Sequence, residues 1–220
     1  MTFDTAYLVA QFPALWRGLL MTLEVSLVAM ALSIVIGTAG AAARQLRIPV
    51  LSPLVFAYVE LIRNTPLLVQ MFFIFYGLPA IGIRLSLFWS GVASLAVWAG
   101  AFQVENIRGG LSVVGRGLYD AGLALGLRRA KVLLLVALPI GLRMSIPAML
   151  NTSISLLKNS AYLQAIGLRD LTFVAVDRIS SDFRILEMFA VLLVTYIVLV
   201  FALAAASGVV ERRLRRPFAA

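Results

Sequence analysis

Residues 19–43, LLMTLEVSLVAMALSIVIGTAGAAA, carry one charged side chain, Glu24. A helix of this length extends about 37 Å at 1.5 Å per residue, which is enough to cross the roughly 30 Å hydrocarbon core of a bilayer with some tilt. The stretch therefore predicts a membrane-spanning helix. Arg44 and Arg47 follow it directly, and basic residues at the end of a span favour the cytoplasmic side.

The composition of the whole chain agrees with a membrane protein. Of its 220 residues, 62% are hydrophobic, and the mean hydropathy is +0.99; soluble domains contain roughly 45–50% apolar residues. Because each spanning helix needs about 20 apolar residues, five spans and their connections account for the length. We therefore expect an all-α membrane protein that consists of a single transmembrane domain, residues 1–220.

Four further apolar stretches predict spans at about 54–78, 85–102, 132–157 and 185–210. Residues 1–17 have the pattern of a short amphipathic lead-in. Pro66 removes a backbone donor and pushes the residue before it out of helical geometry, so we expect a kink or break in the second span at mid-depth. Pro139 and Pro147 predict an irregular fourth span. The mixed charges of residues 158–187 predict a partly embedded hairpin or short helix on the outside.

Basic residues near the ends of these spans set the expected orientation. Eleven are assigned to one side: Arg44, Arg47, Arg108, Arg116, Arg128, Arg129, Lys131, Arg212, Arg213, Arg215 and Arg216. Six are assigned to the other: Arg17, Arg84, Lys158, Arg169, Arg178 and Arg184. Since basic residues concentrate in cytoplasmic loops, we expect the N-terminus outside and the C-terminus in the cytoplasm. The basic tail is also explained by a plain stop-transfer role.

The residues that are missing restrict the chemistry. The chain has no Cys and no His, which excludes thiolate redox chemistry, zinc sites built from Cys and His, haem ligation by His and His-based acid or base catalysis. We expect neither a metal nor a cofactor in this chain. No phosphate-binding GxxxxGK[ST] sequence occurs, so we do not expect a self-contained ATP-driven pump. The net charge of +9 arises beside apolar spans, so we expect no binding of nucleic acid.

A polar insert, residues 109–131 (GGLSVVGRGLYDAGLALGLRRAK), separates the third and fourth predicted spans. It combines small residues with basic ones and a single carboxylate, Asp120. In a chain otherwise surrounded by lipid, such an insert predicts a short helix, about 119–127, that meets a partner in water. Asp120 in the first turn and Arg128 after the last would suit the helix dipole. A carboxylate that only caps a loop helix is the other interpretation.

Several motifs resemble those of one transporter family. Residues 60–70 (ELIRNTPLLVQ) resemble the second-span signature of polar amino-acid permeases of ABC transporters, and residues 100–110, containing GAF and ENIRGG, are similar to the segment with which that family enters the cytoplasm. Residues 120–139, with DAG, Gly126 and Leu-Pro, resemble the EAA loop of bacterial importer permeases. Lys158-Asn159-Ser160 stand where the family usually has Lys-Asp-Thr or Lys-Asp-Ser. These ordered matches identify the chain as a member, which implies the fold of a type I importer permease.

Some positions depart from the family pattern. Asp120 replaces the usual Glu and Gly122 replaces the second Ala, so a carboxylate and a small residue remain. Leu118 and Ile140 stand where Gln is common. Asn159 removes a carboxylate, and if this position contacts substrate we expect a cationic amino acid to be less favoured.

The resemblance implies a function and a set of partners. It implies a permease subunit that moves amino acids into the cytoplasm by alternating access, as a multi-pass protein of the bacterial inner membrane, and that is not itself an enzyme. The implied partners are an ATPase dimer that binds ATP and Mg, a second permease subunit that is either a copy or a related chain, and an extracytoplasmic solute-binding protein. The implied ATPase-coupling residues are Asp120, Ala121, Gly122, Ala124, Gly126 and Leu127.

Two groups of polar residues are candidates for the substrate path. They are Arg63, Asn64, Thr65 and Pro66 at the expected break, and Lys158, Asn159 and Ser160 at the end of the fourth span. Broken helices at mid-membrane expose backbone groups to substrate, and the Arg63 guanidinium suits a carboxylate. A structural ion pair between Glu60 and Arg63, which have i, i+3 spacing, is the other interpretation of the first group. For Lys158, snorkelling to the interface is the alternative.

Other classes of function fit less well. An ion-coupled carrier is expected to have more spans and an intramembrane carboxylate relay, for which only Glu24 and Glu60 could serve. A serine hydrolase would need a lysine base, and neither Lys131 nor Lys158 lies at mid-span beside a serine. A scaffold subunit without transport activity remains an alternative. The sequence leaves open which amino acid is carried and whether the pore is homodimeric.

Overall fold

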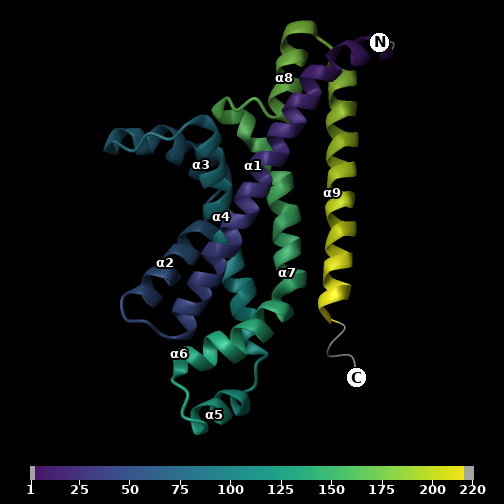
Figure 1. Ribbon diagram of the computed structural model, residues 1–220. Helices are drawn as coiled ribbons and strands as arrows, with labels where there is room; N and C mark the ends of the chain where they lie inside the picture. The colour runs from purple at the N-terminus through teal and green to yellow at the C-terminus, as the bar shows by residue number, and fades with distance from the viewer. Residues whose placement is uncertain (1–2, 216–220) are drawn as a thin grey trace. The chain divides into compact units, whose positions relative to one another are not determined.

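The computed structural model of the protein describes residues 3–215, in which every regular element is a helix (Figure 1). The α-helices are α1 (Thr5–Gln45), α2 (Leu51–Arg63), α3 (Leu67–Phe72), α4 (Leu87–Ser112), α5 (Arg116–Ala124), α6 (Arg129–Val132), α7 (Leu138–Asn159), α8 (Leu171–Asp182) and α9 (Ile185–Arg215). Single π-helical turns are η1 (Phe73–Gly77) and η3 (Leu133–Ala137), and 3-10 turns are η2 (Leu78–Ile81) and η4 (Ser160–Ile166). The predicted all-α fold class is confirmed.

Within residues 3–215, four stretches are long and apolar enough to cross a membrane: Thr5–Gln45, Leu87–Ser112, Arg129–Ile166 and Ile185–Val209. A fifth crossing results if the broken pair of α2 and α3 is counted as one span. The expected number of about five spans is therefore confirmed. Large apolar side chains of α9 such as Leu193 and Phe201 are 63% and 70% exposed, which leaves them free to contact lipid or another subunit. Arg216 of the predicted basic tail lies outside the described residues.

The first span is longer than the sequence indicated, because the lead-in is part of α1. The Asp4 carboxylate accepts a hydrogen bond from the backbone N of Tyr7 at 3.0 Å, which caps an unpaired donor of the first turn. Arg184, beside the start of α9, donates to Asp4 at 3.2 Å and to Glu187 at 3.4 Å. These bonds hold the first turn in place, and the helix continues through Pro13.

The predicted irregularities in the second and fourth spans are confirmed. α2 ends at Arg63 and α3 begins at Leu67, so the helix is broken where Pro66 was expected to break it. In the fourth span the π-helical turn η3 stands immediately before the helix that contains Pro139, whereas Pro147 lies within α7 without ending it. α4 extends through Ser112, beyond the expected end at residue 102.

The chain forms two compact units. The first consists of the chain to Met30, Leu67–Leu95 and Ile154–Ala204, and the second of Ala31–Pro66, Ala96–Ser153 and the chain from Ala205. Helices α1, α4, α7 and α9 each contribute residues to both units.

In the first unit, the N-terminal part of α1 packs with α8 and the start of α9. Its buried core consists of Leu15, Leu171, Ala175 and Met188. The Thr22 hydroxyl on α1 donates to the Gly18 carbonyl and accepts from the backbone N of Leu171, both at 3.1 Å. Thr22 therefore fixes the beginning of α8 against α1.

In the second unit, the C-terminal part of α1 packs against α4 and against the segment between α5 and α7. One buried cluster consists of Ala41, Ile107, Leu111, Val114, Leu133 and Ala137, and a smaller one of Val59, Ala101 and Val104. A side chain at Gly37 would overlap with the Cβ of Gln103, so the absence of a side chain permits the close approach of α1 and α4. This packing supports the segment that carries α5.

Candidate functional site

The predicted coupling helix is present, but it is shifted toward the N-terminus. α5 covers Arg116–Ala124, three residues earlier at each end than the expected 119–127. Asp120 is therefore the fifth residue of the helix and does not lie in its first turn. Because the helix dipole acts mainly within the first and last turns, the dipole argument for Asp120 does not hold.

The end of α5 is set by a glycine. Gly126 has φ of 81°, in the left-handed region that glycine adopts without a steric penalty. The backbone N of Leu127 donates to the Gly122 carbonyl at 3.1 Å, and the backbone N of Gly126 donates to the Leu123 carbonyl at 2.9 Å. This is the Schellman pattern that closes helices. Gly126 thus terminates the helix. This structural role explains the glycine without any contact to a partner protein.

The small residues of α5 do not share one surface. Gly122 is buried, and a Cβ placed there would lie 2.8 Å from Cγ2 of Val132. Its small size therefore serves packing within the chain, against α6. Ala121 and Ala124 are exposed, and Leu127 is half-buried. Among the small residues predicted to contact the ATPase, Ala121 and Ala124 are the ones that remain available for contact with a partner.

An exposed part of α5 combines apolar side chains with a carboxylate. Leu118 is 47% exposed and Leu125 at the end of the helix is 82% exposed. Asp120 is exposed too, and within the described part of the chain it forms no ion pair. Exposed apolar side chains can bury area against a partner, and an available carboxylate can form a charged hydrogen bond with it.

α5 is attached to the second unit on its other side. The Tyr119 hydroxyl accepts a hydrogen bond from Nε2 of Gln45, at the end of α1, at 3.1 Å. The Tyr119 ring also packs on the buried cluster that contains Ile107 and Leu133. Through Tyr119, α5 is therefore in contact with the end of α1 and with the buried cluster of the second unit.

The ENIRGG motif connects α4 to its neighbours. Oε1 of Glu105 accepts from Nη1 of Arg44 at 2.5 Å and from Nε of Arg108 at 3.2 Å. Nδ2 of Asn106 lies 2.8 Å from the Thr152 hydroxyl on α7. The motif thus joins α1, α4 and α7 within the second unit through charged and neutral hydrogen bonds.

The polar residues at the break after α2 interact mainly with the end of that helix. Nδ2 of Asn64 donates to the Glu60 carbonyl at 2.8 Å and to its carboxylate at 3.3 Å, and the Thr65 hydroxyl donates to the carbonyl four residues earlier at 2.8 Å. The expected ion pair of Glu60 with Arg63 is not formed: the Arg63 guanidinium lies 5.3 Å from the centre of the Phe102 ring. Stacking on this ring competes with the ion pair, and Arg63 remains exposed.

The second candidate group for the path lies in the first unit. Lys158 is exposed, Asn159 is half-buried, and Ser160 is buried with its hydroxyl donating to a backbone carbonyl at 2.7 Å. Lys158 borders an apolar cavity of about 520 Å³ that Thr172 and Tyr196 also line. Their hydroxyls lie 3.0 Å apart. Arg63 to Pro66 belong to the second unit and Lys158 to Ser160 to the first.

Asp170 is a buried acidic residue that the sequence analysis did not single out. It precedes α8, and its Oδ1 accepts from the backbone N of Phe173 at 2.8 Å. Burial raises the pKa of Asp170 to about 7, although hydrogen bonds from Phe173 and Thr172 oppose the shift. The signal was available, since an Asp directly before an apolar helical stretch is typical of a helix N-cap.

Comparison with known proteins gives consistent matches over nearly the whole chain. The model of the family described as binding-protein-dependent transport system inner membrane component matches residues 33–216. The chain is 31% identical over 217 residues to the glutamine transport system permease protein GlnP of Escherichia coli (strain K12), covering 98% of this chain and 99% of that protein. It is 36% identical over 171 residues to the probable glutamine ABC transporter permease protein GlnP of Bacillus subtilis (strain 168), covering 78% of each.

Among solved structures, the chain resembles one in the crystal structure of an amino acid ABC transporter with histidines. The TM-score is 0.86 at 32% sequence identity, and the match covers 97% of this chain and 100% of that one.

Proposed function

Since the chain belongs to the family of binding-protein-dependent transport system inner membrane components and is an ABC transporter permease subunit, we propose that it moves amino acids into the cytoplasm by alternating access. A separate ATPase, docked on the insert 109–131, powers the movement. The observation that carries the proposal is α5, an exposed helix that the second unit holds through Tyr119.

The docking surface consists of the exposed part of α5. Leu118 and Leu125 supply apolar area, and Asp120 supplies a carboxylate for a charged hydrogen bond with the ATPase. Movement of the ATPase then displaces α5, and the bond of Tyr119 to Gln45 passes the displacement to the end of α1. Since α1 is a single helix of 41 residues, this displacement reaches the membrane-spanning segment.

The insert faces the cytoplasm in this proposal, with the N-terminus outside and the chain in the bacterial inner membrane. Arg116, Arg128, Arg129 and Lys131 are all exposed, which favours a cytoplasmic location by the positive-inside bias. Because the chain has no Cys, Leu125→Cys and Phe183→Cys each give a single thiol at a site that is 82% or 79% exposed. A membrane-impermeant maleimide added to intact spheroplasts is expected to label Phe183→Cys only. Labelling of Leu125→Cys alone would show that the orientation is the opposite one.

The substrate path includes the break between α2 and α3. Arg63 is exposed and is held by the Phe102 ring, so its guanidinium is available to a carboxylate. Lys158, Asn159 and Ser160, in the first unit, are proposed as a separate group of path residues.

The other components are separate molecules. The proposed partners are a dimer of ATPase subunits that binds ATP and Mg, a second permease subunit, either identical or related, and an extracytoplasmic solute-binding protein. This chain holds no cofactor and does not bind nucleic acid in the proposal.

Replacement of Asp120 tests the docking role. In proteoliposomes that contain this chain and its ATPase, Asp120→Lys is expected to abolish the stimulation of ATP hydrolysis by substrate-loaded binding protein, because it reverses the charge at the contact. Asp120→Asn, which keeps the shape, should retain part of it. Both variants are expected to insert into the membrane at the wild-type level, since Asp120 is exposed and unpaired among the described side chains. Full stimulation in Asp120→Lys would contradict docking through this residue.

A further inference from the structure

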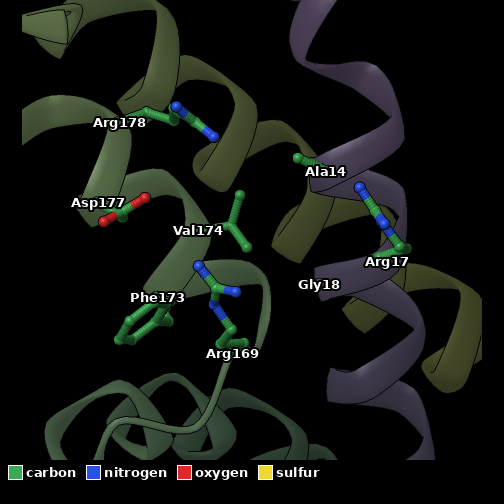
Figure 2. Close-up of a pocket in the computed structure, with 8 residues that line it drawn as sticks. All are labelled: Ala14, Arg17, Gly18, Arg169, Phe173, Val174, Asp177 and Arg178. Carbon is green, nitrogen blue, oxygen red and sulfur yellow. The ribbon is translucent and has the colours of Figure 1, made fainter. Parts of the chain in front are cut away.

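A cavity of about 360 Å³ lies within the first unit, between α1 and α8. Its lining residues are Ala14, Arg17, Gly18, Arg169, Phe173, Val174, Asp177 and Arg178. Figure 2 shows Arg17 reaching from α1 and Arg169 and Arg178 from the α8 side, with the three guanidinium groups around one space. The volume is within the roughly 300–1,000 Å³ of small-molecule sites and is larger than a single carboxylate needs.

The positive charge of the cavity is incompletely compensated within the chain. Among the described side chains, neither Arg17 nor Arg169 forms an ion pair, and Arg178 has a distant one, with its Nη1 3.8 Å from Oδ2 of Asp182. Nε of Arg178 is buried without a hydrogen-bond partner in this part of the chain. A buried donor without a partner is costly, so an anion bound in the cavity would supply the hydrogen-bond acceptor that the fold lacks.

Local contacts hold the arginines in place. Nε of Arg17 donates to the carbonyl of Pro13 at 3.2 Å, and the Arg169 guanidinium lies 5.9 Å from the centre of the Phe173 ring. A Cβ at Gly18 would lie 2.9 Å from the Asp170 carbonyl oxygen, so only a residue without a side chain lets the loop before α8 approach α1 this closely. The arginines are therefore positioned before any ligand arrives, which lowers the entropy cost of binding.

The same cavity contains a carboxylate and an apolar wall. Asp177 is exposed, and the described side chains include none that forms an ion pair with it. Phe173 and Val174 supply the apolar surface. The site thus offers guanidinium groups for a carboxylate, an acidic group for an ammonium and a wall for carbon atoms, which are the three parts of an α-amino acid.

We propose that this cavity is an entry site for the transported amino acid, ahead of the membrane-spanning path. The α-carboxylate binds Arg17 and Arg169, and the ammonium group binds Asp177. Because three arginines face one carboxylate, the site favours acidic amino acids over neutral ones and neutral ones over cationic ones. Arg17 lies in the N-terminal part of α1, and Arg169 and Arg178 lie between the spans Arg129–Ile166 and Ile185–Val209, so the site is near a membrane surface. The inference rests on the proposed transport function, which places that surface outside.

Binding measurements on the purified complex of this chain with its ATPase, without binding protein, test the site. Titration calorimetry is expected to show glutamate binding more tightly than glutamine, and arginine more weakly than either. Arg17→Gln and Arg169→Gln should each weaken glutamate binding about tenfold to hundredfold, as expected for the loss of a charged hydrogen bond. Arg17→Lys should recover part of the loss, and Arg84→Gln, an exposed arginine outside the cavity, should change nothing.

Asp177 has its own test. Asp177→Asn should weaken the binding of glutamate. Glutarate, which has two carboxylates and no ammonium group, should bind the variant with wild-type affinity. Equal affinities for glutamate in the wild type, Arg17→Gln and Arg169→Gln, with unchanged unfolding temperatures, would overturn the proposal. So would phosphatidylglycerol that co-purifies with the wild type and is lost from both variants while no amino acid binds, since the cavity would then hold a lipid phosphate. Either failure leaves the Asp120 test of docking untouched, so the two proposals fail separately.

Discussion

Gly122→Ala probes the contact that positions α5. A Cβ at this position would lie 2.8 Å from Cγ2 and 3.1 Å from Cγ1 of Val132. Val132 is 1% exposed, and its branched side chain has one strongly preferred rotamer in a helix. It cannot move aside easily, so the helix α5 has to shift. The departure from the family pattern at Gly122 thus has a structural explanation, because Val132 occupies the space that a second Ala would need.

Two opposing effects determine the size of the change. Ala in a helix interior is favoured over Gly by about 0.5–1 kcal/mol, whereas insertion of a methyl group into a packed contact costs about 1–3 kcal/mol. The contact with rigid Val132 should dominate, and we expect a net loss of about 1–2 kcal/mol in the docking of α5 on the second unit. Removal of the obstruction in Gly122→Ala/Val132→Ala should recover part of it.

The readout is ATP hydrolysis stimulated by substrate-loaded binding protein, measured beside the unfolding temperature of the complex. Gly122→Ala is expected to reduce stimulation several-fold, and the double variant to restore it partly. Gly117→Ala is the matched control, because it lies in the same helix with no atom within 4 Å of an added Cβ, and it should retain full stimulation. If Gly122→Ala and Gly117→Ala behave alike, the contact with Val132 does not position α5.

Three further changes have defined outcomes. Burial raises the pKa of Asp170 to about 7, so the folded protein retains a proton that the unfolded chain releases near pH 4. The free energy of unfolding should therefore fall between about pH 4 and 7 by up to roughly 1.4 kcal/mol per pH unit. Asp170→Asn, which keeps the cap, should flatten the dependence of the unfolding temperature on pH. Glu105→Gln removes the ion pairs with Arg44 and Arg108 and should lower the free energy of unfolding by about 1–3 kcal/mol. An unchanged unfolding temperature would contradict a stabilising role of these ion pairs. Arg63→Ala should impair uptake more than assembly; a wild-type uptake rate in an intact complex would remove Arg63 from the path.

Patterns in the sequence were sufficient for the membrane spans and for the family. Apolar length predicts a span because the bilayer imposes it, and Pro66 predicts a break because it lacks a donor. The motifs between residues 60 and 160 indicated the permease family, and the match over residues 33–216 confirms it. These features depend on local composition, which is why one sequence was enough.

Helix ends were less predictable, because neighbours in space decide them. α5 was expected to end after Gly126, although a glycine in that position is a typical helix terminator. Asp4 caps α1 well before residue 19, where the span was expected to begin. In both cases a capping residue marks the end of the helix, which the apolar pattern alone does not reveal.

Contacts between distant residues had no signal in the sequence. The i, i+3 spacing of Glu60 and Arg63 suggested an ion pair, but Arg63 stacks on Phe102 of another helix. The cavity brings Arg17 together with Arg169, which follows it by 152 positions. No periodicity reveals such a meeting, since it depends on how α8 packs on α1.

The central claim is that this chain carries amino acids across a membrane at the expense of ATP that is hydrolysed on the α5 side. The most direct measurement is uptake of radiolabelled glutamine by proteoliposomes containing this chain and its ATPase, with binding protein on the outside and ATP inside. The account predicts accumulation above the external concentration, lost in Asp120→Lys. Equilibration that is independent of ATP, or accumulation undiminished in Asp120→Lys, would contradict it.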